Sequence, residues 1–575
     1  MIAVLITWVI IFFFLFSFGD ILLTVYNKYC KRDETYSYTD KAILGLSFVT
    51  ILLSVWSLWL PSNHIFLTLG LLIVFIYWIF NREKRKKILL SIKERLKQLS
   101  HIEKGIILIF FILILIGNLW IPGIFDSLYY HHQNIRWNEE FAVVPGLGNL
   151  EDRYSFNSNY LLLSAIFTFR PVFGESIYTL NSLFFVLLWG WILYEIFTSK
   201  YEIKRTLIFI SFSLFYLISL IFIYDTSTDL LPNLIVFYMI ARVIIKPEFV
   251  KQNHLLFFIA PIFLLTCKLS VFPFCIFTLY LFIILIKKKR YKEISFLILT
   301  GMLILIPWLV RNVIISGYLV YPMHEIDLFS FDWKVPREIA IKAKDYILFV
   351  GNEFFTFITT TPFRKYRDPI WVNLLSLMIY GLCILSVVVI IYKLVLKRKN
   401  IPLSYFLSAL ILVLCLVIWY INGPDMRFIP GISTIFLSLT GGFILFGKKK
   451  IQTKYFTYAA FALLLASSYI WTARELHRGY NVVEETKTVV PSPFYRILAK
   501  PYSQKWLTLH SDFEKDVELY TLNDGISIYI CHMQVTYDIL PAVVYEVRGK
   551  FIDHTCIEAR GTSLQEGFRT KNECE

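Results

Sequence analysis

The chain has 575 residues, of which 57% are hydrophobic and 18% aromatic, and its mean hydropathy is +0.62. Charged residues make up only 17%, whereas an ordinary soluble domain has nearer to a quarter, so the composition excludes a soluble globular protein. The formal net charge of +15 does not indicate nucleic acid binding, because the basic residues lie in short segments between apolar runs. The sequence therefore predicts a polytopic membrane protein with no nucleic acid partner.

Apolar segments long enough to cross a bilayer recur along the chain. A helix rises about 1.5 Å per residue, so about 17 to 23 residues span the roughly 30 Å of hydrocarbon. Only helices satisfy all of their backbone hydrogen bonds in that environment, so we expect each segment to be helical. The sequence predicts about fourteen transmembrane helices, at residues 2–24, 41–60, 64–80, 104–121, 176–197, 206–224, 230–245, 255–269, 270–286, 294–311, 370–392, 402–421, 428–446 and 455–472.

Short basic loops between these segments predict the orientation of the chain. Six of them hold 28 of the 57 Lys and Arg residues: 82–104, 199–206, 242–252, 287–292, 393–399 and 448–454. Because positively charged loops stay in the cytoplasm, the long loops 121–175 and 312–369 and the tail from 473 are expected outside. The tail fits that position, with 12 Lys and Arg against 15 Asp and Glu.

Residues 83–99 form a basic amphipathic segment. Its apolar residues fall on one face of a helix, and eight basic residues lie in or beside it. This pattern is typical of a helix that lies in the membrane interface on anionic lipid, and a plain linker helix is the alternative.

Of the eight cysteines, Cys531, Cys556 and Cys574 fall in the expected outer tail, whereas the others lie in or near apolar segments. Outer compartments are oxidising, so we expect at most one disulfide, with Cys531 and Cys556 as the candidate pair. No spacing resembles a zinc site.

The first long outer loop begins with PGIFDSLYYHHQNIRW, residues 122–137. Asp126 follows an apolar segment by a few residues, so its carboxylate is expected at the outer boundary of the membrane. A carboxylate at that depth is able to take a proton from an acceptor hydroxyl while a lipid-linked substrate lies in the bilayer, which suits glycosyl transfer. His131, His132 and Arg136 are candidate substrate-binding residues beside it. The alternative is that Asp126 only caps a helix that begins there.

Further along this loop, SFNSNY at 155–160 precedes a short apolar run at 160–169. We expect the run to form a half-length helix that lies along the membrane surface or dips into it. Asn157 is a candidate ligand for sugar hydroxyls, with turn capping as the alternative.

More polar residues lie at the outer ends of apolar segments. Asp229 stands in a short outer turn, where capping is the alternative to a role in the site. Lys268 is flanked by apolar runs, a costly position unless the ammonium group is functional or snorkels. Arg311 in PWLVRN, and Asp425 with Arg427 in GPDMRF, lie at segment ends, with interfacial anchoring as the alternative. A phosphate leaving group needs cations, so the three cations fit a transfer reaction that releases phosphate.

An acidic residue in the first long outer loop, a polytopic helical body and a C-terminal outer domain together resemble the GT-C class of integral membrane glycosyltransferases. The segments RNVIISGYLVYP, DWKVP, GPDMRF and ARGTSLQEGF, with the loop that begins GIFDSLYYHH, resemble an uncharacterised family of bacterial membrane proteins from about residue 104 onward. The GT-C resemblance implies an enzyme, a hexosyl- or pentosyltransferase, that uses a polyprenyl-phosphate-linked sugar. It also implies a place in the bacterial inner membrane, with the active site facing the periplasm or exterior.

The resemblance makes Asp126 the catalytic carboxylate, acting as a base or, in metal-using members of the class, as a ligand. The phosphate-binding role falls on one of the three cations. The sequence leaves the metal open: a divalent cation is compatible with the class, and Glu139 and Glu140 are the available acidic neighbours. The acceptor is expected to be an extracytoplasmic glycan, lipid or protein.

The expected fold class is an all-α polytopic membrane protein, GT-C-like, with a small C-terminal α+β domain outside the membrane. We divide the chain into accessory helices with the basic interfacial helix at 1–103, a catalytic core at 104–472 and a soluble domain at 473–575. In the usual GT-C pattern the acidic loop follows the first helix, whereas here three apolar segments and the basic helix precede it.

Two other functions fit parts of the sequence. A polymerase or ligase of surface polysaccharide, acting on lipid-linked oligosaccharides, would use arginines in a large outer loop, and 312–369 contains Arg337, Arg364 and Arg367. A transporter or flippase would show internal repeats and ionisable residues near mid-membrane, whereas the ionisable residues here gather at segment ends. Glycosyl transfer accounts for more of the sequence than either alternative.

Overall fold

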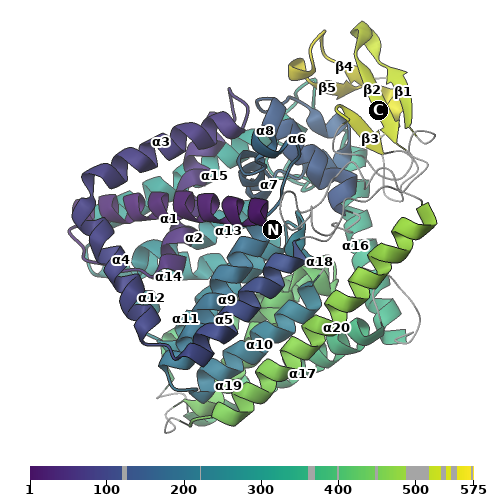
Figure 1. Ribbon diagram of the computed structural model, residues 1–575. Helices are drawn as coiled ribbons and strands as arrows, with labels where there is room; N and C mark the ends of the chain where they lie inside the picture. Colours follow the sequence, from purple (N-terminus) through teal and green to yellow (C-terminus); the bar gives the residue numbers. More distant parts are fainter. Residues whose placement is uncertain are drawn as a thin grey trace.

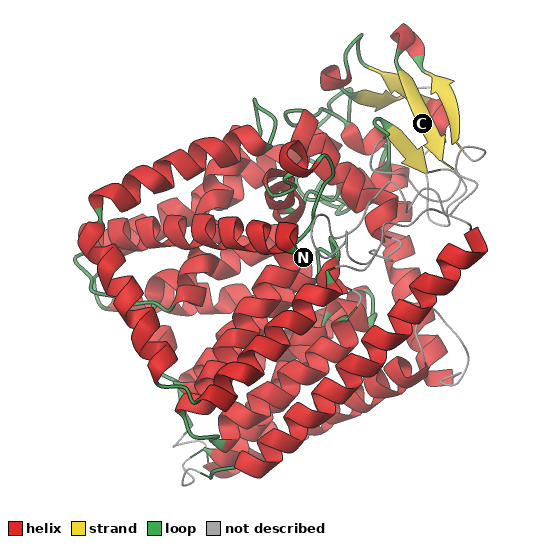
Figure 2. Cartoon of the chain, in the orientation of Figure 1, coloured by secondary structure: helices red, strands yellow, loops and turns green. Residues whose placement is uncertain are grey.

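The computed structural model describes residues 1–118, 126–220, 222–360, 370–397, 401–446, 451–486, 517–531, 539–544, 553–571 and 574. Helices dominate these residues, and the strands are confined to the C-terminal part (Figure 2). The described part of the chain is therefore predominantly helical, as its composition predicts.

The first five helices are α1 (Ile2–Cys30), α2 (Tyr38–Trp56), α3 (His64–Phe80), α4 (Arg82–Lys97) and α5 (His101–Gly117). α1 and α2 cross closely because each has a glycine at the contact. A Cβ on Gly19 would lie 1.8 Å from the carbonyl oxygen of Lys41, and a Cβ on Gly45 would lie 1.8 Å from that of Leu15. Small residues of this kind let membrane helices pack backbone to backbone.

One apolar core continues from these helices into the later ones. It includes Phe14 of α1, Phe184 and Phe209 of later helices, and Ile435 near the C-terminal end of the helical body. Residues 1–103 thus share their core with the remainder of the body, and the domain boundary at 103 stays a prediction.

The first outer loop is folded into short helices: η1, a π-helical turn (Ser127–His131), α6 (His132–Glu140), the 3₁₀ turns η2 (Leu147–Asn149) and η3 (Asp152–Ser155), α7 (Asn159–Ile166) and α8 (Arg170–Phe173). The half-length helix expected at 160–169 is α7. All eight of its residues are buried, and it packs against α2, α6 and α13. It is enclosed by protein.

The remaining helical elements follow in chain order: α9 (Leu180–Thr198), α10 (Ile203–Ser219), η4 (Phe222–Tyr224), α11 (Leu230–Ile245), α12 (Phe249–Gln252), α13 (His254–Cys267), η5 (Leu269–Phe274), α14 (Cys275–Lys287), α15 (Tyr291–Ser316), α16 (Arg337–Thr360), α17 (Ile370–Lys397), α18 (Leu403–Asn422), η7 (Met426–Phe428), α19 (Pro430–Leu445) and α20 (Lys454–Thr486). Each of the predicted apolar segments coincides with one of the helices. α16 was not expected, because charged residues such as Lys342, Lys344 and Asp345 interrupt its apolar pattern.

Seven helical segments in the described part of the chain are long and apolar enough to cross a membrane, or up to eight if the bent pair α3–α4 is one span. Three shorter apolar helices, α11, α13 and α19, accompany them. The protein is therefore a helical membrane protein. The number of crossings, about fourteen from the sequence, stays a prediction.

Two of the basic loops meet at one end of the helical body. The backbone N–H of Ile203 donates to the carbonyl of Ile451 at 3.0 Å, and the hydroxyls of Tyr201 and Tyr458 lie 2.8 Å apart. The loops around residues 199–206 and 451–454 are thus in contact. In Figure 1, α4 lies at the edge of the helical body away from the C-terminal strands.

The C-terminal strands form two small sheets that pack on the first outer loop. In one sheet, β2 (Ser527–Cys531) lies between β1 (Val517–Thr521), antiparallel, and β3 (Ala542–Val544), parallel; β4 (Ile557–Ala559) and β5 (Phe568–Thr570) form an antiparallel pair. Their buried side chains share a second core with residues of the loop such as Trp137 and Leu150.

The expected disulfide between Cys531 and Cys556 is wrong. Cys556 is bonded to Cys574, with the two Cα atoms 5.8 Å apart, whereas Cys531 is a buried free thiol at the end of β2. β2 packs Cys531 against Tyr129 of the loop, whereas Cys556 and Cys574 flank the β4–β5 pair. Sequence spacing alone does not distinguish these pairings.

Candidate functional site

Five of the ten predicted site residues meet in one charged group, which we term the Asp126 cluster: Asp126, Asp229, Lys268, Asp425 and Arg427. Arg427 Nη1 lies 2.9 Å from Asp126 Oδ2, and its Nε lies 2.8 Å from Asp425 Oδ2. Lys268 forms an ion pair with Asp229. Residues from four separate parts of the sequence are thereby brought together.

The aromatic ring of Phe428 joins the two halves of the cluster. Lys268 Nζ lies 4.1 Å from the ring centroid, and Arg427 Cζ lies 5.0 Å from it. The five charged side chains are between 12% and 28% exposed. The two cations lie against one aromatic ring, are partly exposed and are paired with carboxylates. An anionic ligand is able to replace these carboxylates as the partner of the cations.

Helix capping, the alternative role for Asp126 and Asp229, is not what these two carboxylates do. Asp126 precedes the π-helical turn η1 and Asp229 precedes α11, but neither side chain makes a capping hydrogen bond. Asp425 does accept the backbone N–H of Arg427, so it holds the turn η7 as well as the guanidinium. π-helical turns are common at functional sites, and η1 begins directly after Asp126.

His131 and His132 lie beside the cluster in a buried polar layer. The hydroxyl of Thr226 donates to Ser127 Oγ at 2.9 Å, and Ser127 Oγ lies 3.4 Å from His131 Nδ1. His132 stacks on Tyr178 with ring centroids 4.5 Å apart, and its Nε2 lies 3.8 Å from Asp225 Oδ1.

Burial lowers the pKa of His131 to about 4, so the imidazole is neutral at neutral pH. The neutral ring carries one N–H, and its Nδ1 shares a hydrogen bond with Ser127 Oγ. His131 Nε2 has no hydrogen-bond partner among the described residues, and neither do the ring nitrogens of His132. This layer can therefore supply neutral hydrogen-bonding groups next to the charged cluster.

Arg311 and Asn157 belong to a different network. Arg311 is buried and donates to Ser57 Oγ at 2.7 Å, to Asn138 Oδ1 at 2.7 Å and to Asn157 Oδ1 at 3.3 Å. Asn157 also donates to the carbonyl of Trp308 at 3.1 Å. These neutral acceptors bind all three nitrogens of the guanidinium, and the network ties α15 to the end of α2, to α6 and to the loop. The structure does not bring either residue to the Asp126 cluster.

Arg136 also lies apart from the cluster. It forms a partly exposed ion pair with Glu140 at 2.8 Å, one turn along α6. Glu139 instead accepts from Arg170 at 3.0 Å and from Thr168 at 2.7 Å. The two glutamates considered as metal ligands thus already serve as partners of arginines.

The structure adds Glu151, Asp152 and Arg153, which the sequence reasoning missed. Glu151 and Asp152 are buried, Tyr129 donates to Glu151 Oε1 at 2.9 Å, and Arg153 Nε lies 3.6 Å from Asp152 Oδ2. Burial raises the pKa of Tyr130, and the charges of Asp126 and Asp152 act in the same direction. Tyr130 is therefore close to both carboxylates, so these residues adjoin the cluster. The signal in the sequence was weak, because charged residues after Gly146 and Gly148 read as an exposed turn.

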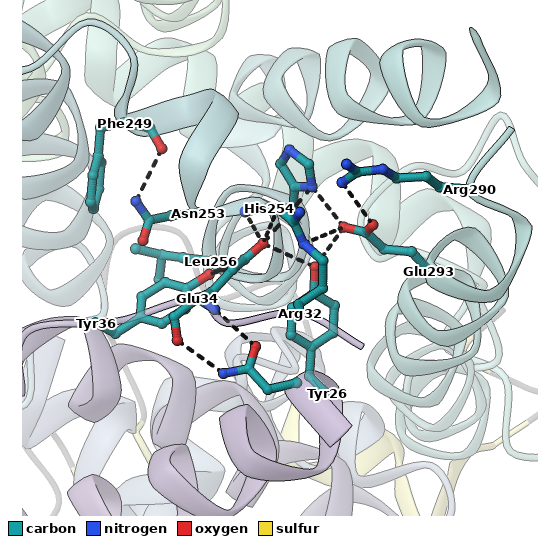
Figure 3. Close-up of polar contacts among 11 residues, drawn as sticks. Tyr26, Arg32, Glu34, Tyr36, Phe249, Asn253, His254, Leu256, Arg290 and Glu293 are labelled. Atoms are coloured by element: carbon teal, nitrogen blue, oxygen red, sulfur yellow. Dashed lines mark hydrogen bonds and ion pairs between the residues drawn. The ribbon is translucent and has the colours of Figure 1, made fainter. Parts of the chain in front are cut away.

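A second charged group, the Glu34 cluster, lies where the α1–α2 loop meets α13 and α15 (Figure 3). It consists of Glu34, His254 and Glu293 with Arg32 and Arg290. His254 Nδ1 lies 2.6 Å from Glu293 Oε1, and Arg32 Nη2 lies 3.0 Å from Glu34 Oε1. Arg290 Nη1 lies 3.4 Å from Glu293 Oε2.

Within the described residues, Glu34, His254 and Glu293 are the only group of three potential metal ligands with ligand atoms within 4.8 Å of one another. Their donor set does not fit a divalent cation well. Two arginines already balance the two carboxylates, and Tyr26 donates to Glu293 Oε1 at 2.6 Å. A closed, neutralised hydrogen-bond network has the character of a structural anchor.

The comparisons with known proteins identify a family but no activity. The family model described as Domain of unknown function (DUF8201) matches residues 1–436, and the chain belongs to this family. No curated protein and no solved structure matches the chain. The matched region contains all five residues of the Asp126 cluster and ends within α19, before α20 and the C-terminal strands.

Proposed function

We propose that the protein is a glycosyltransferase of the bacterial inner membrane that transfers a sugar from a polyprenyl-phosphate carrier to an acceptor on the outer side. The observation that carries this proposal is the contact between Arg427 and Asp126, 2.9 Å, with Lys268 on the same Phe428 ring. Such a transfer needs one base and at least one cation for the leaving phosphate.

The outward orientation rests on two further observations. The described basic loops at residues 199–206 and 451–454 meet at one end of the helical body, the pattern of a cytoplasmic side. The C-terminal strands carry the disulfide Cys556–Cys574, and disulfides persist in oxidising compartments. The Asp126 cluster adjoins the loop on which these strands pack.

In the proposed reaction, Asp126 takes the proton of the acceptor hydroxyl while the hydroxyl oxygen forms a bond to the anomeric carbon. The bond from that carbon to the phosphate oxygen breaks with its electron pair, and the polyprenyl phosphate leaves against Lys268 and Arg427. A single displacement with one base inverts the configuration at the anomeric carbon. The neutral His131, beside the cluster, supplies its Nε2 as a hydrogen-bonding partner for a sugar hydroxyl.

The test is release of polyprenyl phosphate from defined lipid-linked sugars by the purified full-length protein in detergent. Wild type is compared with Asp126→Asn, and Arg136→Gln serves as the control because it changes a charge on the same loop outside the cluster. We expect Asp126→Asn to lower the rate roughly 100- to 1000-fold with an unchanged melting temperature.

Three other outcomes of this experiment would contradict the proposed function. Equal rates for wild type and Asp126→Asn would remove the catalytic role of this carboxylate. Release only from oligosaccharide diphosphate carriers would favour the polymerase or ligase, and counterflow of labelled substrate in liposomes without a covalent product would establish a transporter.

A further inference from the structure

The elbow between α3 and α4 is a separate feature of the molecule, at the left edge of the helical body in Figure 1. α3 ends at Phe80, α4 begins at Arg82, and the two helices are bent by 91° at Asn81. The outer face of α3 exposes apolar side chains over its whole length, for example Ile65, Leu72 and Ile79. If α3 lies along the membrane normal, α4 lies along the membrane surface.

α4 has no buried residue. Leu89, Ile92 and Leu96 recur at helical spacing and are 61%, 40% and 51% exposed, so they form an apolar stripe that no described part of the protein covers. The same helix carries eight Lys and Arg residues against two Glu. An exposed apolar stripe flanked by cations is the arrangement of a helix that rests on anionic lipid.

The elbow forms an open groove of about 630 Å³, lined by Ile79, Phe80, Asn81, Arg82, Glu83, Lys84 and Lys87. Its apolar side is the end of α3, where Phe80 is 82% exposed. Its polar side is the first turn of α4, with three basic side chains and one acidic one. The lining changes from apolar to cationic across the bend. It therefore complements a phospholipid, in which apolar acyl chains adjoin an anionic headgroup.

Lys84 fixes the bend. Its Nζ lies 2.5 Å from Asp20 Oδ2 of α1 and donates to Thr24 Oγ1 at 2.8 Å, while Lys41 occupies Asp20 Oδ1 at 2.7 Å. Asp20 is fully buried. The ion pair between Lys84 and Asp20 therefore fixes the angle between α3 and α4. Arg82 and Lys87 are exposed on the groove, with no ion-pair partner among the residues described here.

We propose that this groove binds the headgroup of an anionic phospholipid. Arg82 and Lys87 contact the lipid phosphate, Ile79 and Phe80 contact the adjoining acyl chains, and the Leu89–Leu96 stripe lies in the same leaflet. The site is separate from the Asp126 cluster and does not depend on the proposed transferase activity.

The test is lipid binding by the purified full-length protein, measured by native mass spectrometry with phosphatidylglycerol or with phosphatidylcholine of the same acyl chains. The variant Arg82→Gln/Lys87→Gln removes two charges from the groove. The control Lys93→Gln/Lys97→Gln removes two charges from the same exposed helix away from it. All four positions are exposed, so each variant is expected to fold.

We expect the wild type to prefer phosphatidylglycerol, the groove variant to lose about tenfold in affinity for it, and the control to lose less than about threefold. Equal losses in both variants would overturn the proposal, because they would indicate a general polybasic attraction. So would equal binding of the two lipids. Displacement of the lipid by millimolar inorganic phosphate would assign the groove to free phosphate and would also overturn it.

Discussion

The Asp126 cluster and the Glu34 cluster contain the same kinds of groups but differ in how they are enclosed. In the Glu34 cluster the side chains of Glu34, His254 and Glu293 are 1% to 3% exposed, and arginines and tyrosines occupy the carboxylates. In the Asp126 cluster, Asp126 is 28% and Arg427 21% exposed. A closed ion-pair network fixes neighbouring helices, whereas a partly open one is able to receive a ligand.

The comparison also shows why a ligand geometry alone is a poor guide to a site. The described residues that satisfy a metal-like spacing are Glu34, His254 and Glu293, yet their charges are already balanced. The Asp126 cluster lacks that spacing but holds accessible charges at the end of membrane helices. The two clusters should therefore respond differently to the loss of one charge, the first in stability and the second in activity.

The largest effect is expected from Arg427→Gln. The guanidinium contacts both Asp126 and Asp425, so its loss removes the positioning of the base and a cation for the leaving phosphate. We expect polyprenyl phosphate release to fall roughly 100- to 1000-fold, with Arg427→Lys between the variant and wild type because lysine cannot bridge two carboxylates in the same way. Full activity of Arg427→Gln would contradict a functional role for the Asp126 cluster.

Glu293→Gln should act on stability. The variant leaves Arg290, Arg32 and His254 without their shared carboxylate in a buried network, so we expect the free energy of unfolding to fall by about 3 kcal/mol. Unfolding in mixed micelles measures this change. Glu83→Gln is the control, because its pair with Lys86 is largely exposed on α4. A normal stability of Glu293→Gln, or a loss of turnover in its folded fraction, would contradict the structural role.

His131 should make the polar layer beside the Asp126 cluster sensitive to pH. Its pKa is lowered from 6.5 to about 4 by burial, so the unfolded chain binds this proton more readily than the folded one. The free energy of unfolding is then unaffected above pH 6.5 and decreases as the pH falls toward 4, by about 3 kcal/mol in total. Melting curves across this range should show a shallower decrease for His131→Asn, and an unchanged one for the exposed control His101→Asn. Parallel decreases for His131→Asn and wild type would contradict the buried neutral state.

The smallest effect is expected from Arg136→Gln. This residue was a candidate from the sequence, but its ion-pair partner among the described residues is Glu140 on the surface of α6. Surface ion pairs of this spacing contribute about 0.5 kcal/mol or less, so stability and turnover should both stay close to wild type. A strong loss of turnover would mean that the site extends further along α6 than the Asp126 cluster.

The sequence determined the class of this protein and the positions of its helices. Runs of apolar residues dictate helices locally, because the backbone has no other way to satisfy its hydrogen bonds in hydrocarbon. The half-length helix α7 was predictable from its short apolar run, while α16 was not, since its charged residues break the apolar pattern. The sequence also showed that the charged residues Asp126, Lys268 and Arg427 lie at helix ends.

Only the tertiary structure decided which of these groups meet. Asp126 and Arg427 are 301 residues apart and pair across the helical body, whereas Arg311, which looked equivalent in the sequence, is enclosed by Ser57, Asn138 and Asn157. The disulfide partner of Cys556 was decided in the same way. Local patterns fix the placement of a residue along its own helix, but contacts between distant residues depend on how helices and loops pack, which no short stretch of sequence encodes.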